Sequence, residues 1–288
     1  MQEKESVALA QKLSEISVKS FYSPYENLAF PETMDKVQWF TSPELISIYG
    51  TQAYEGLSEE KKKLLSFYEA VNFYSLNIHG EKALMEGLAR RLHDQEHDAH
   101  TRYIHHFLDE ENKHMVYFGT FCTRYAGKVY ADRKFQFPRE YATGEEELLF
   151  FLKVMIFEEI VDYYNKSMST DQRLNEVARK INLFHHKDEI RHLIYGRQRV
   201  KELFQEHSPK WPQKTLDDLR TYVQSYFVTT WREYYNPDIY KDVGIENAYE
   251  LADEVFHSET AKLHRERVSK HCVDYLMECG ILIERPNL

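Results

Sequence analysis

The sequence predicts an all-α protein in which a four-helix bundle is flanked by further helices on its N-terminal and C-terminal sides. Helix-breaking residues are scarce, with only 10 Gly and 8 Pro among 288 residues. Long segments rich in Glu, Lys, Leu, Ala and Arg carry apolar residues at helical spacing, and strand signals are almost absent. No stretch has the composition of a linker, so we expect residues 1–288 to form a single domain with a core at about 58–207.

Local signals mark the ends of the four bundle helices. Ser58 is placed to cap the first helix, Gly127 follows the second, and Gly144 opens the third. The pair Thr170-Asp171 can cap the fourth helix. The residues from 128 to 143, with Pro138 among them, would return the chain to the other end of the bundle. The predicted helices span about 58–92, 96–126, 144 up to the Thr170-Asp171 cap, and from that cap to 206, with two or three further helices around 213–234 and 245–276.

Composition and charge disfavour several classes of function. A net charge of −10 argues against a nucleic-acid-binding surface. The N-terminus lacks the apolar core of a signal peptide, and no apolar run approaches the roughly 20 residues of a membrane span. We therefore expect a cytoplasmic protein without a nucleic-acid or membrane partner. The three cysteines form no CxxC pair, which argues against a disulfide framework and against a zinc finger.

The most informative motif is a repeated Glu-x-x-His phrase, formed by Glu111 with His114 and by Glu189 with His192. On a helix, residues three apart project from the same face, so each phrase can offer a carboxylate and an imidazole to one metal ion. Both phrases fall on the apolar stripe of their helix, where an unpaired ionised carboxylate would cost several kcal/mol. A metal ion would satisfy these groups, and buried ion pairs between helices are the alternative.

Two single glutamates complete the pattern. Glu81 lies on the apolar stripe of the first helix, and Glu158 or Glu159 lies on that of the third. The four helices then read Glu, Glu-x-x-His, Glu, Glu-x-x-His, which is the ligand order of ferritin-like bundles that bind two iron or manganese ions. A ligand set without thiolates makes iron the first choice and manganese the second. By analogy with ferritin-like sites in general, we expect Glu111 and Glu189 to be the carboxylates that bridge the two ions.

Two further acids, Glu110 and Asp188, stand directly before the motif glutamates. They are placed to accept a hydrogen bond from the imidazole of the opposite helix, which would fix its tautomer. Solvent-exposed surface acids are an equally good interpretation of the sequence.

His185 adds a third imidazole, because it lies one turn before Glu189 and extends the second phrase to His-x-x-x-Glu-x-x-His. A lone histidine on an apolar face is more often a hydrogen-bonded core residue. The complete pattern, with Gly80 before Glu81, resembles the AurF-type p-aminobenzoate N-oxygenases over residues 64–200. That resemblance implies a ferritin-like di-metal site with seven ligands and no further catalytic residue. The seven ligands would be Glu81, Glu111, His114, Glu158, His185, Glu189 and His192.

The resemblance also bears on the uncertain ligands. It favours Glu158 over Glu159, because the spacing from Glu158 to His185 and Glu189 matches the family pattern. The interval from Glu81 to Glu111 is shorter than in the family, so Glu86 is a minor alternative to Glu81.

The resemblance implies a non-haem di-iron enzyme that activates dioxygen and oxidises the nitrogen of a small arylamine. No flavin or nicotinamide fingerprint is present, so an external electron donor, a redox partner protein or a reductant, would be needed. We expect a monomer or homodimer. The alternatives are a hydroxylase or desaturase that acts on carbon and a ferritin-like iron-binding protein or ferroxidase. Candidate pocket residues near the ligands are Tyr74, Asn77, Tyr163 and Tyr164, although aromatic core filling explains each tyrosine as well.

Overall fold

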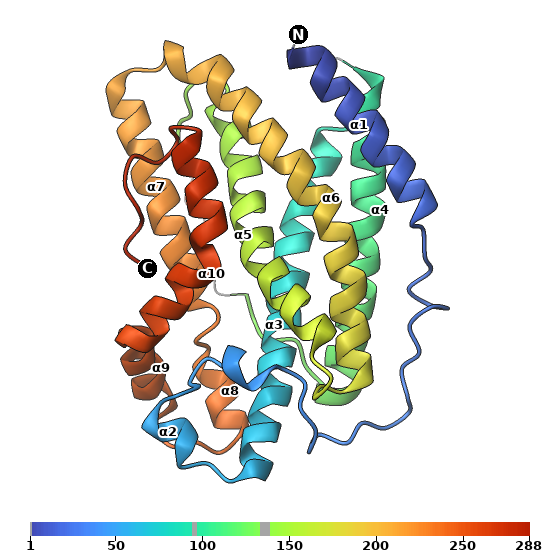
Figure 1. Cartoon of the computed structure of the whole chain (residues 1–288), viewed down its shortest axis with the longest axis vertical. Coiled ribbons are helices and arrows are strands. Elements are labelled where there is room, and N and C mark those ends of the chain that lie inside the picture. The colour runs from blue at the N-terminus through green and yellow to red at the C-terminus, as the bar shows by residue number, and fades with distance from the viewer. Residues whose placement is uncertain (1, 94–96, 133–138) are drawn as a thin grey trace.

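A computed structural model describes residues 2–93, 97–132 and 139–288. Four long helices lie side by side and form the centre of the molecule (Figure 1). Among the described residues, the β pairing is limited to one isolated bridge between Trp39 and Leu174. The prediction of an all-α helical bundle is therefore confirmed. The bundle helices are α3 (Glu59–Arg90), α4 (Asp98–Phe121), α5 (Glu145–Thr170) and α6 (Glu176–His207).

Three of the predicted helix ends are present in the structure. The Ser58 side chain accepts a hydrogen bond from the backbone N–H of Lys61 and caps α3. Gly127 and Gly144 both have positive φ, at 70° and 78°, a conformation that glycine adopts without strain. Gly127 closes η2 (Cys122–Ala126), a π-helical turn that extends α4, and Gly144 precedes α5. The predicted start of the second helix at residue 96 lies outside the described residues.

The predicted cap of the fourth helix is wrong. Thr170 is still the last residue of α5, and the Asp171 carboxylate accepts hydrogen bonds from Ser42 and Arg173. The chain then turns, and Asn175 caps α6 by accepting a hydrogen bond from the N–H of Val177. Asp171 thus anchors the turn between α5 and α6 to the N-terminal segment.

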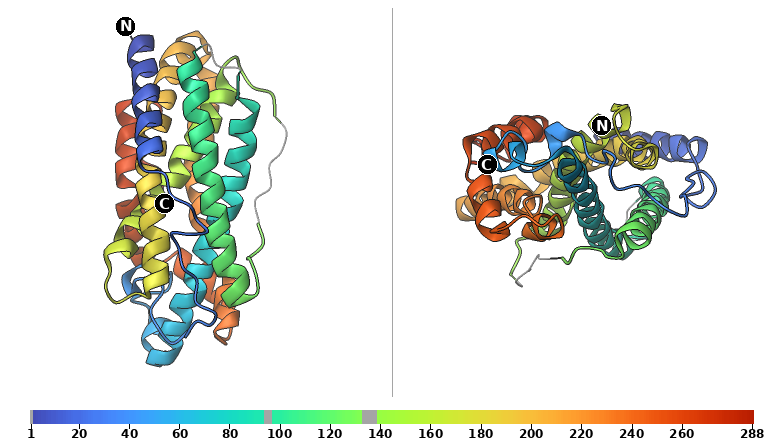
Figure 2. Two further views of the ribbon diagram at one scale, coloured as in Figure 1. Left: turned by 90° about the vertical axis from the view of Figure 1, so that its right-hand side faces the viewer. Right: turned by 90° about the horizontal axis from the view of Figure 1, so that it is seen from below.

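The connection from α4 to α5 joins opposite ends of the bundle, as predicted (Figure 2). At its start, the Tyr130 N–H donates to Ser75 on α3, and the Tyr130 hydroxyl donates to Asp242. At its end, the Ala142 N–H donates to the Glu145 carboxylate in the first turn of α5. Residues 133–138, which include Pro138, are not described.

The N-terminal segment contains an additional helix, as the fold prediction required. Helix α1 (Gln2–Lys19) packs against α4 and α6 (Figure 1). The chain then passes η1 (Pro43–Leu45) and the short α2 (Gln52–Glu55) before it enters the bundle.

The C-terminal helices cover another side of the bundle, where α7 and α10 pack against α5 and α8 packs against α3. Helices are present in both predicted regions, 213–234 and 245–276, and the second region is divided: the chain breaks at His257 and restarts where Ser258 caps the next helix through the Ala261 N–H. The segments are η3 (Ser208–Lys210), α7 (Gln213–Arg232), α8 (Pro237–Asp242), α9 (Ala248–Phe256) and α10 (Glu259–Glu278). None of the described helices combines the length and the apolar character that a membrane crossing requires.

Candidate metal centre

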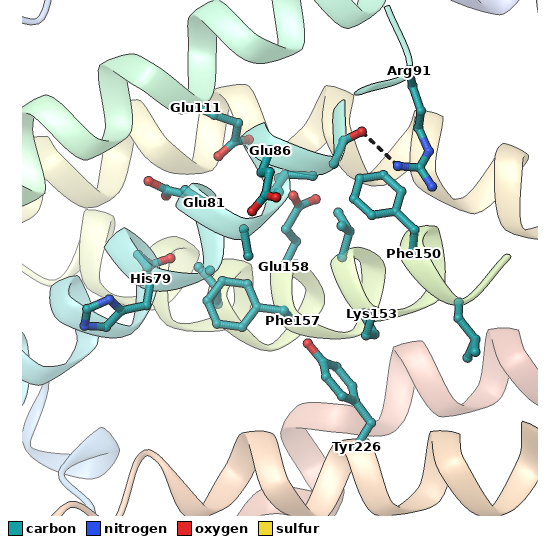
Figure 3. Close-up of a pocket in the computed structure, with 18 of the residues that line it drawn as sticks. His79, Glu81, Glu86, Arg91, Glu111, Phe150, Lys153, Phe157, Glu158 and Tyr226 are labelled. Atoms are coloured by element: carbon teal, nitrogen blue, oxygen red, sulfur yellow. Dashed lines mark hydrogen bonds between the residues drawn. The ribbon is translucent and has the colours of Figure 1, made fainter. Parts of the chain in front are cut away.

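The seven residues predicted as metal ligands lie together between α3, α4, α5 and α6, and each is at most 4 % exposed. Figure 3 shows Glu81, Glu111 and Glu158 converging from three of these helices. The donor atoms fall into two groups, within each of which they lie no more than 4.8 Å apart. The first group is Glu81, His114 and His185, and the second is Glu111, Glu158, Glu189 and His192.

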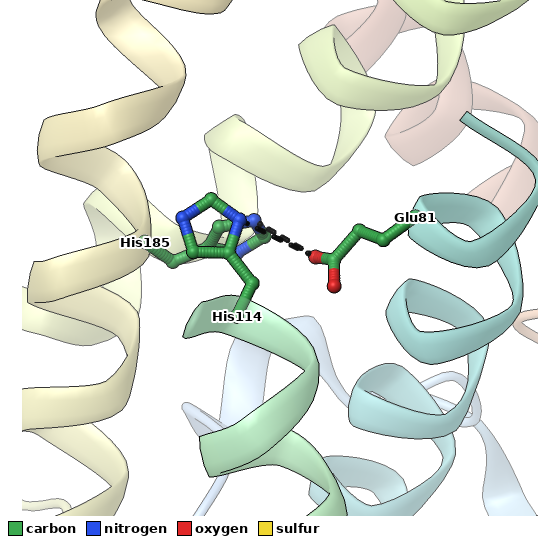
Figure 4. Close-up of side chains that lie close together, drawn as sticks. All are labelled: Glu81, His114 and His185. Carbon is green, nitrogen blue, oxygen red and sulfur yellow. Dashed lines mark ion pairs between the residues drawn. The ribbon is translucent and has the colours of Figure 1, made fainter. Parts of the chain in front are cut away.

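In the first group, one carboxylate faces two imidazoles (Figure 4). The Glu81 Oε1 atom lies 3.6 Å from His114 Nδ1 and 3.4 Å from His185 Nε2. The three residues come from three helices, α3, α4 and α6. The nitrogen that each imidazole turns toward Glu81 is available to a metal ion held between them.

Glu111 and Glu189 of the second group also approach imidazoles of the first group. Glu111 places one oxygen 3.4 Å from His114 Nδ1 and the other 2.9 Å from His192 Nδ1. Glu189 places Oε1 2.8 Å from His185 Nε2 and Oε2 3.4 Å from His192 Nδ1. Each of these carboxylates therefore has one oxygen directed toward each group, which is the arrangement that a bridging ligand requires.

The donor set fits two divalent cations. All eight oxygens of Glu81, Glu111, Glu158 and Glu189 are buried and lack a hydrogen-bond partner among the described residues. Buried carboxylates without partners are strongly destabilising. Four ionised carboxylates carry a charge of −4, which two divalent cations would neutralise. Oxygen and imidazole donors without thiolates suit iron or manganese.

Electrostatic interactions inside the cluster are strong. Burial raises the pKa of Glu158, and the neighbouring Glu189 carboxylate raises it further. Although burial opposes the charge of Glu189, the imidazoles of His192 and His185 hold its pKa well below the usual range. Bound cations would favour the ionised form of every carboxylate, so metal binding would displace protons from the site.

Hydrogen bonds cross between α4 and α6 and orient two of the imidazoles. The His114 Nε2–H on α4 donates to Asp188 of α6 over 3.2 Å, and the His192 Nε2–H on α6 donates to Glu110 of α4 over 2.8 Å. Both donations leave Nδ1 directed into the cluster. The prediction that Glu110 and Asp188 reach the opposite imidazole is confirmed, and both acids are buried.

Arg191 and Tyr22 stabilise these two acids, and neither residue was predicted from the sequence. The Arg191 guanidinium donates to both Glu110 and Asp188. The Tyr22 hydroxyl, from the segment after α1, donates to Asp188 over 3.0 Å. The position of Arg191, between the two residues of the second phrase, was a signal for its role. Tyr22 is 166 positions away from Asp188 and carried no such signal.

Asn165 holds the third imidazole. Its side-chain amide lies 2.8 Å from His185 Nδ1, and its Oδ1 atom has no partner among the described residues. The orientation of an asparagine amide is assigned from its hydrogen bonds. With the Asn165 amide turned by 180°, its Oδ1 atom accepts a hydrogen bond from His185 Nδ1–H. His185 Nε2 is then free for a metal ion. Asn165 follows Glu158 by seven residues and so shares its helix face, which was the available sequence signal.

The alternative ligands lie outside the cluster. Glu159 accepts a hydrogen bond from Arg197 Nε over 2.7 Å and lies 3.1 Å from His271 on α10. The side chain of Glu86 is 67 % exposed and pairs with Arg90. Glu158 rather than Glu159, and Glu81 rather than Glu86, therefore face the other five residues.

A cavity of about 580 Å³ reaches the cluster between α3 and α5. Its inner wall includes five of the seven cluster residues, and its outer wall includes Tyr222 and Tyr226 of α7. Among the predicted pocket residues, Asn77 lines this cavity, whereas Tyr164 lines a different one and Tyr74 accepts a hydrogen bond from Asn182 in the core. The five inner residues are Glu81, Glu111, Glu158, His185 and Glu189.

Two pairs of glycine and phenylalanine shape the cavity walls. A Cβ atom added to Gly80 would lie 2.6 Å from the Phe157 ring, and one added to Gly87 would lie 2.1 Å from the Phe150 ring. The Arg91 guanidinium covers the Phe150 ring at 3.8 Å from its centroid. The glycines of α3 thus let two aromatic rings of α5 lie against its backbone, which keeps space open beside the cluster (Figure 3).

The chain resembles one described protein family in sequence. The sequence model of a family described as P-aminobenzoate N-oxygenase AurF matches residues 3–280. The match therefore extends well beyond the 64–200 core and includes α1 and the C-terminal helices. A search of curated proteins finds no match.

Solved structures share the fold. One is an R2-like ligand-binding oxidase, a Tyr-to-Phe mutant with an anaerobically reconstituted Mn/Fe cofactor, with a TM-score of 0.50 and 14 % identity over 95 % of this chain and 93 % of that chain. A second Tyr-to-Phe mutant of an R2-like ligand-binding oxidase, with an aerobically reconstituted Mn/Fe cofactor, has a TM-score of 0.50 and 13 % identity over the same fractions.

Proposed function

This chain belongs to the p-aminobenzoate N-oxygenase AurF family and is an oxygen-dependent di-metal oxidoreductase; from that premise we propose that it oxidises the nitrogen of a small arylamine at a pair of iron ions. The observation that carries the proposal is the cluster of four buried carboxylates, whose eight oxygens have no hydrogen-bond partner among the described residues and which lie beside three imidazoles. The cavity that opens onto this cluster supplies a binding site for a small molecule.

We assign the metal ligands as follows. Glu81, His114 and His185 would hold one ion, Glu158 and His192 would hold the other, and Glu111 and Glu189 would bridge them. When bound, such a pair of ions activates dioxygen for transfer of an oxygen atom, using electrons from an external donor. Manganese suits the same donors and is the alternative metal.

The protein itself would bind and orient the substrate. The Gly80–Phe157 contact lies next in sequence to Glu81 and Glu158, so the Phe157 ring forms a wall at the inner end of the cavity. A flat aromatic ring can pack against this wall with its amino group toward the carboxylates. Leu84 and Val161 supply apolar surface around the same space and reduce its water content.

Product analysis tests the proposal. The protein is loaded anaerobically with Fe²⁺, reduced, and mixed with dioxygen and p-aminobenzoate, and we expect hydroxylamine, nitroso or nitro products by mass spectrometry. The His185→Ala variant should lose this activity because its first metal group keeps only one imidazole. A product hydroxylated on the ring carbon would overturn N-oxygenation in favour of a carbon hydroxylase. Oxidation of iron without any organic product would favour a ferroxidase.

A further inference from the structure

A second cavity of about 490 Å³ lies away from the metal cluster. It is bounded by the segment 44–51, by α3 and α5, and by α9 and α10. Its buried wall contains one carboxyl group, Glu69, and tyrosines 164, 234 and 235, together with apolar side chains, and the exposed Arg267 also lines it. Glu69 precedes Glu81 by twelve positions on α3, which is about 18 Å along the helix. The two cavities are therefore distinct sites.

Glu69 is a buried carboxyl group that forms no ion pair with a cation in the part of the chain that the structure describes. It is 7 % exposed, and among the described residues it accepts hydrogen bonds from the N–H and the hydroxyl of Ser47. Burial raises its pKa to about 7. Other buried acids outside the metal cluster have cations, as Glu145 has Arg139 and Glu110 has Arg191. A buried carboxylate that lines a cavity and lacks a cation favours a positively charged ligand.

Tyr234 supplies a further polar group in the same wall. Its side chain is 6 % exposed, and its hydroxyl has no hydrogen-bond partner among the described residues. An orphaned hydroxyl costs free energy unless a ligand or water completes its hydrogen bond. The Tyr234 ring lies 5.1 Å from that of Tyr164, so aromatic surface surrounds the hydroxyl.

Another part of the cavity wall is held by hydrogen bonds that link Arg267, His264 and Tyr164. Burial lowers the pKa of His264 to about 4, so its imidazole is neutral. Arg267 donates to His264 Nδ1 over 3.0 Å, and His264 Nε2–H then donates to the Tyr164 hydroxyl over 3.0 Å. The Tyr164 hydroxyl and ring are thereby held in place at the cavity wall.

We propose that this second cavity binds a small primary ammonium ion, with Glu69 as its counter-charge and Tyr234 as a hydrogen-bond acceptor. Aromatic faces attract organic cations, and a carboxylate among them adds charge complementarity. The tyrosine walls also provide apolar contact for a hydrocarbon group attached to the ammonium. This binding site does not depend on the metal ions or on the reaction at the cluster.

Benzylammonium is a suitable probe, because at neutral pH its nitrogen is protonated and has no lone pair for a metal ion. Benzyl alcohol has nearly the same shape and no charge. In calorimetric titration of the metal-loaded protein, we expect saturable binding of benzylammonium and at least tenfold weaker binding of benzyl alcohol. Equal binding of the two compounds, or no saturable binding of benzylammonium, would overturn the proposal.

Glu69→Gln keeps an acceptor for the Ser47 N–H and removes the charge, so it should weaken benzylammonium binding at least tenfold. The matched control is Glu44→Gln, which makes the same change in the wall of the same cavity at a residue that Arg173 already pairs. It should alter binding less than about twofold. If Glu69→Gln does not fold, Tyr234→Phe, which removes only the orphaned hydroxyl, should weaken binding about twofold to tenfold. Unchanged affinity in the tested Glu69 or Tyr234 variant would contradict the assignment.

Discussion

The two pairs of bundle helices contribute to the metal cluster in different ways. Helices α4 and α6 each carry a Glu-x-x-His phrase, and each sends an acid to the imidazole of the other. Helices α3 and α5 contribute one cluster glutamate each and leave a cavity between them, where rings of α5 lie against glycines of α3. We infer that α4 and α6 mainly hold the metal ions, whereas α3 and α5 mainly admit the substrate. Substitutions in the two pairs should therefore separate metal binding from substrate binding.

The largest effect on metal content is expected at Glu189 of α6. Glu189→Gln keeps the size of the side chain and removes the charge of a residue that faces both donor groups. The metal content after anaerobic loading should fall from about two ions per chain to near zero. The matched control is Glu159→Gln, which alters an acid paired with Arg197 outside the cluster and should keep both ions. Two tightly bound ions in Glu189→Gln would show that this carboxylate is not a ligand.

A smaller loss of metal affinity is expected at Asp188, which accepts a hydrogen bond from His114 and is not one of the cluster residues. Asp188→Asn retains an acceptor for the His114 Nε2–H and removes the charge, so metal affinity should fall about 10-fold to 100-fold. The affinity is measured by competition with a chelator. Asp162→Asn is the control, because Asp162 of α5 pairs with His186 of α6, an imidazole that is not part of the cluster. Equal losses in the two variants would indicate a general charge effect instead of orientation of His114.

Gly80 of α3 should affect the substrate and leave the metal ions in place. Gly80→Ala places a Cβ 2.6 Å from the Phe157 ring, so the ring must move and the inner end of the cavity changes shape. We expect p-aminobenzoate to bind about tenfold more weakly, measured by titration of the metal-loaded protein.

Gly119→Ala on α4 is the control for that substitution, because its Cβ would meet no atom within 4 Å. Both variants should retain about two metal ions per chain. A loss of metal ions in Gly80→Ala would contradict the division between the two helix pairs.

The smallest effect is expected at Tyr22. Tyr22→Phe removes one hydrogen bond to Asp188 and keeps the ring that stacks on Phe184 at 4.5 Å. Metal affinity should fall about twofold to tenfold, because Arg191 still donates to Asp188. The chelator competition used for Asp188→Asn measures this change. A loss as large as that of Asp188→Asn would make Tyr22 the main support of the acid.

Much of the bundle could be predicted from the sequence because its signals are local. The apolar stripes and the capping Ser58 define α3, and acids or imidazoles that interrupt a stripe mark the cluster. Glu158 and Glu159 could not be separated by the stripe alone, since both face inward within the tolerance of the pattern. The two glutamates differ in the folded structure because Glu159 contacts Arg197 of α6 and His271 of α10 outside the cluster.

The features that the sequence analysis missed depend on contacts between distant segments. Tyr22 and Asp188, which are joined by a hydrogen bond, are 166 positions apart in the sequence. The break between α9 and α10 lies inside a continuous helical pattern of apolar residues, and Ser258 caps the helix that begins after it. Glu69 has an unremarkable place on the stripe of α3. The absence of a cation beside it among the described residues becomes visible only in the folded structure, where Ser47 donates to it and tyrosines 164, 234 and 235 line the same cavity.

Metal analysis of the purified protein is the decisive test of whether the cluster holds two metal ions. After anaerobic loading with Fe²⁺ and removal of loosely bound ions, the account predicts about two iron ions per chain, retained in Glu159→Gln and lost in Glu189→Gln. Negligible iron in the unmodified protein, with negligible manganese after parallel loading, would contradict it. The buried carboxylates and imidazoles would then form ion pairs between helices and not a metal centre.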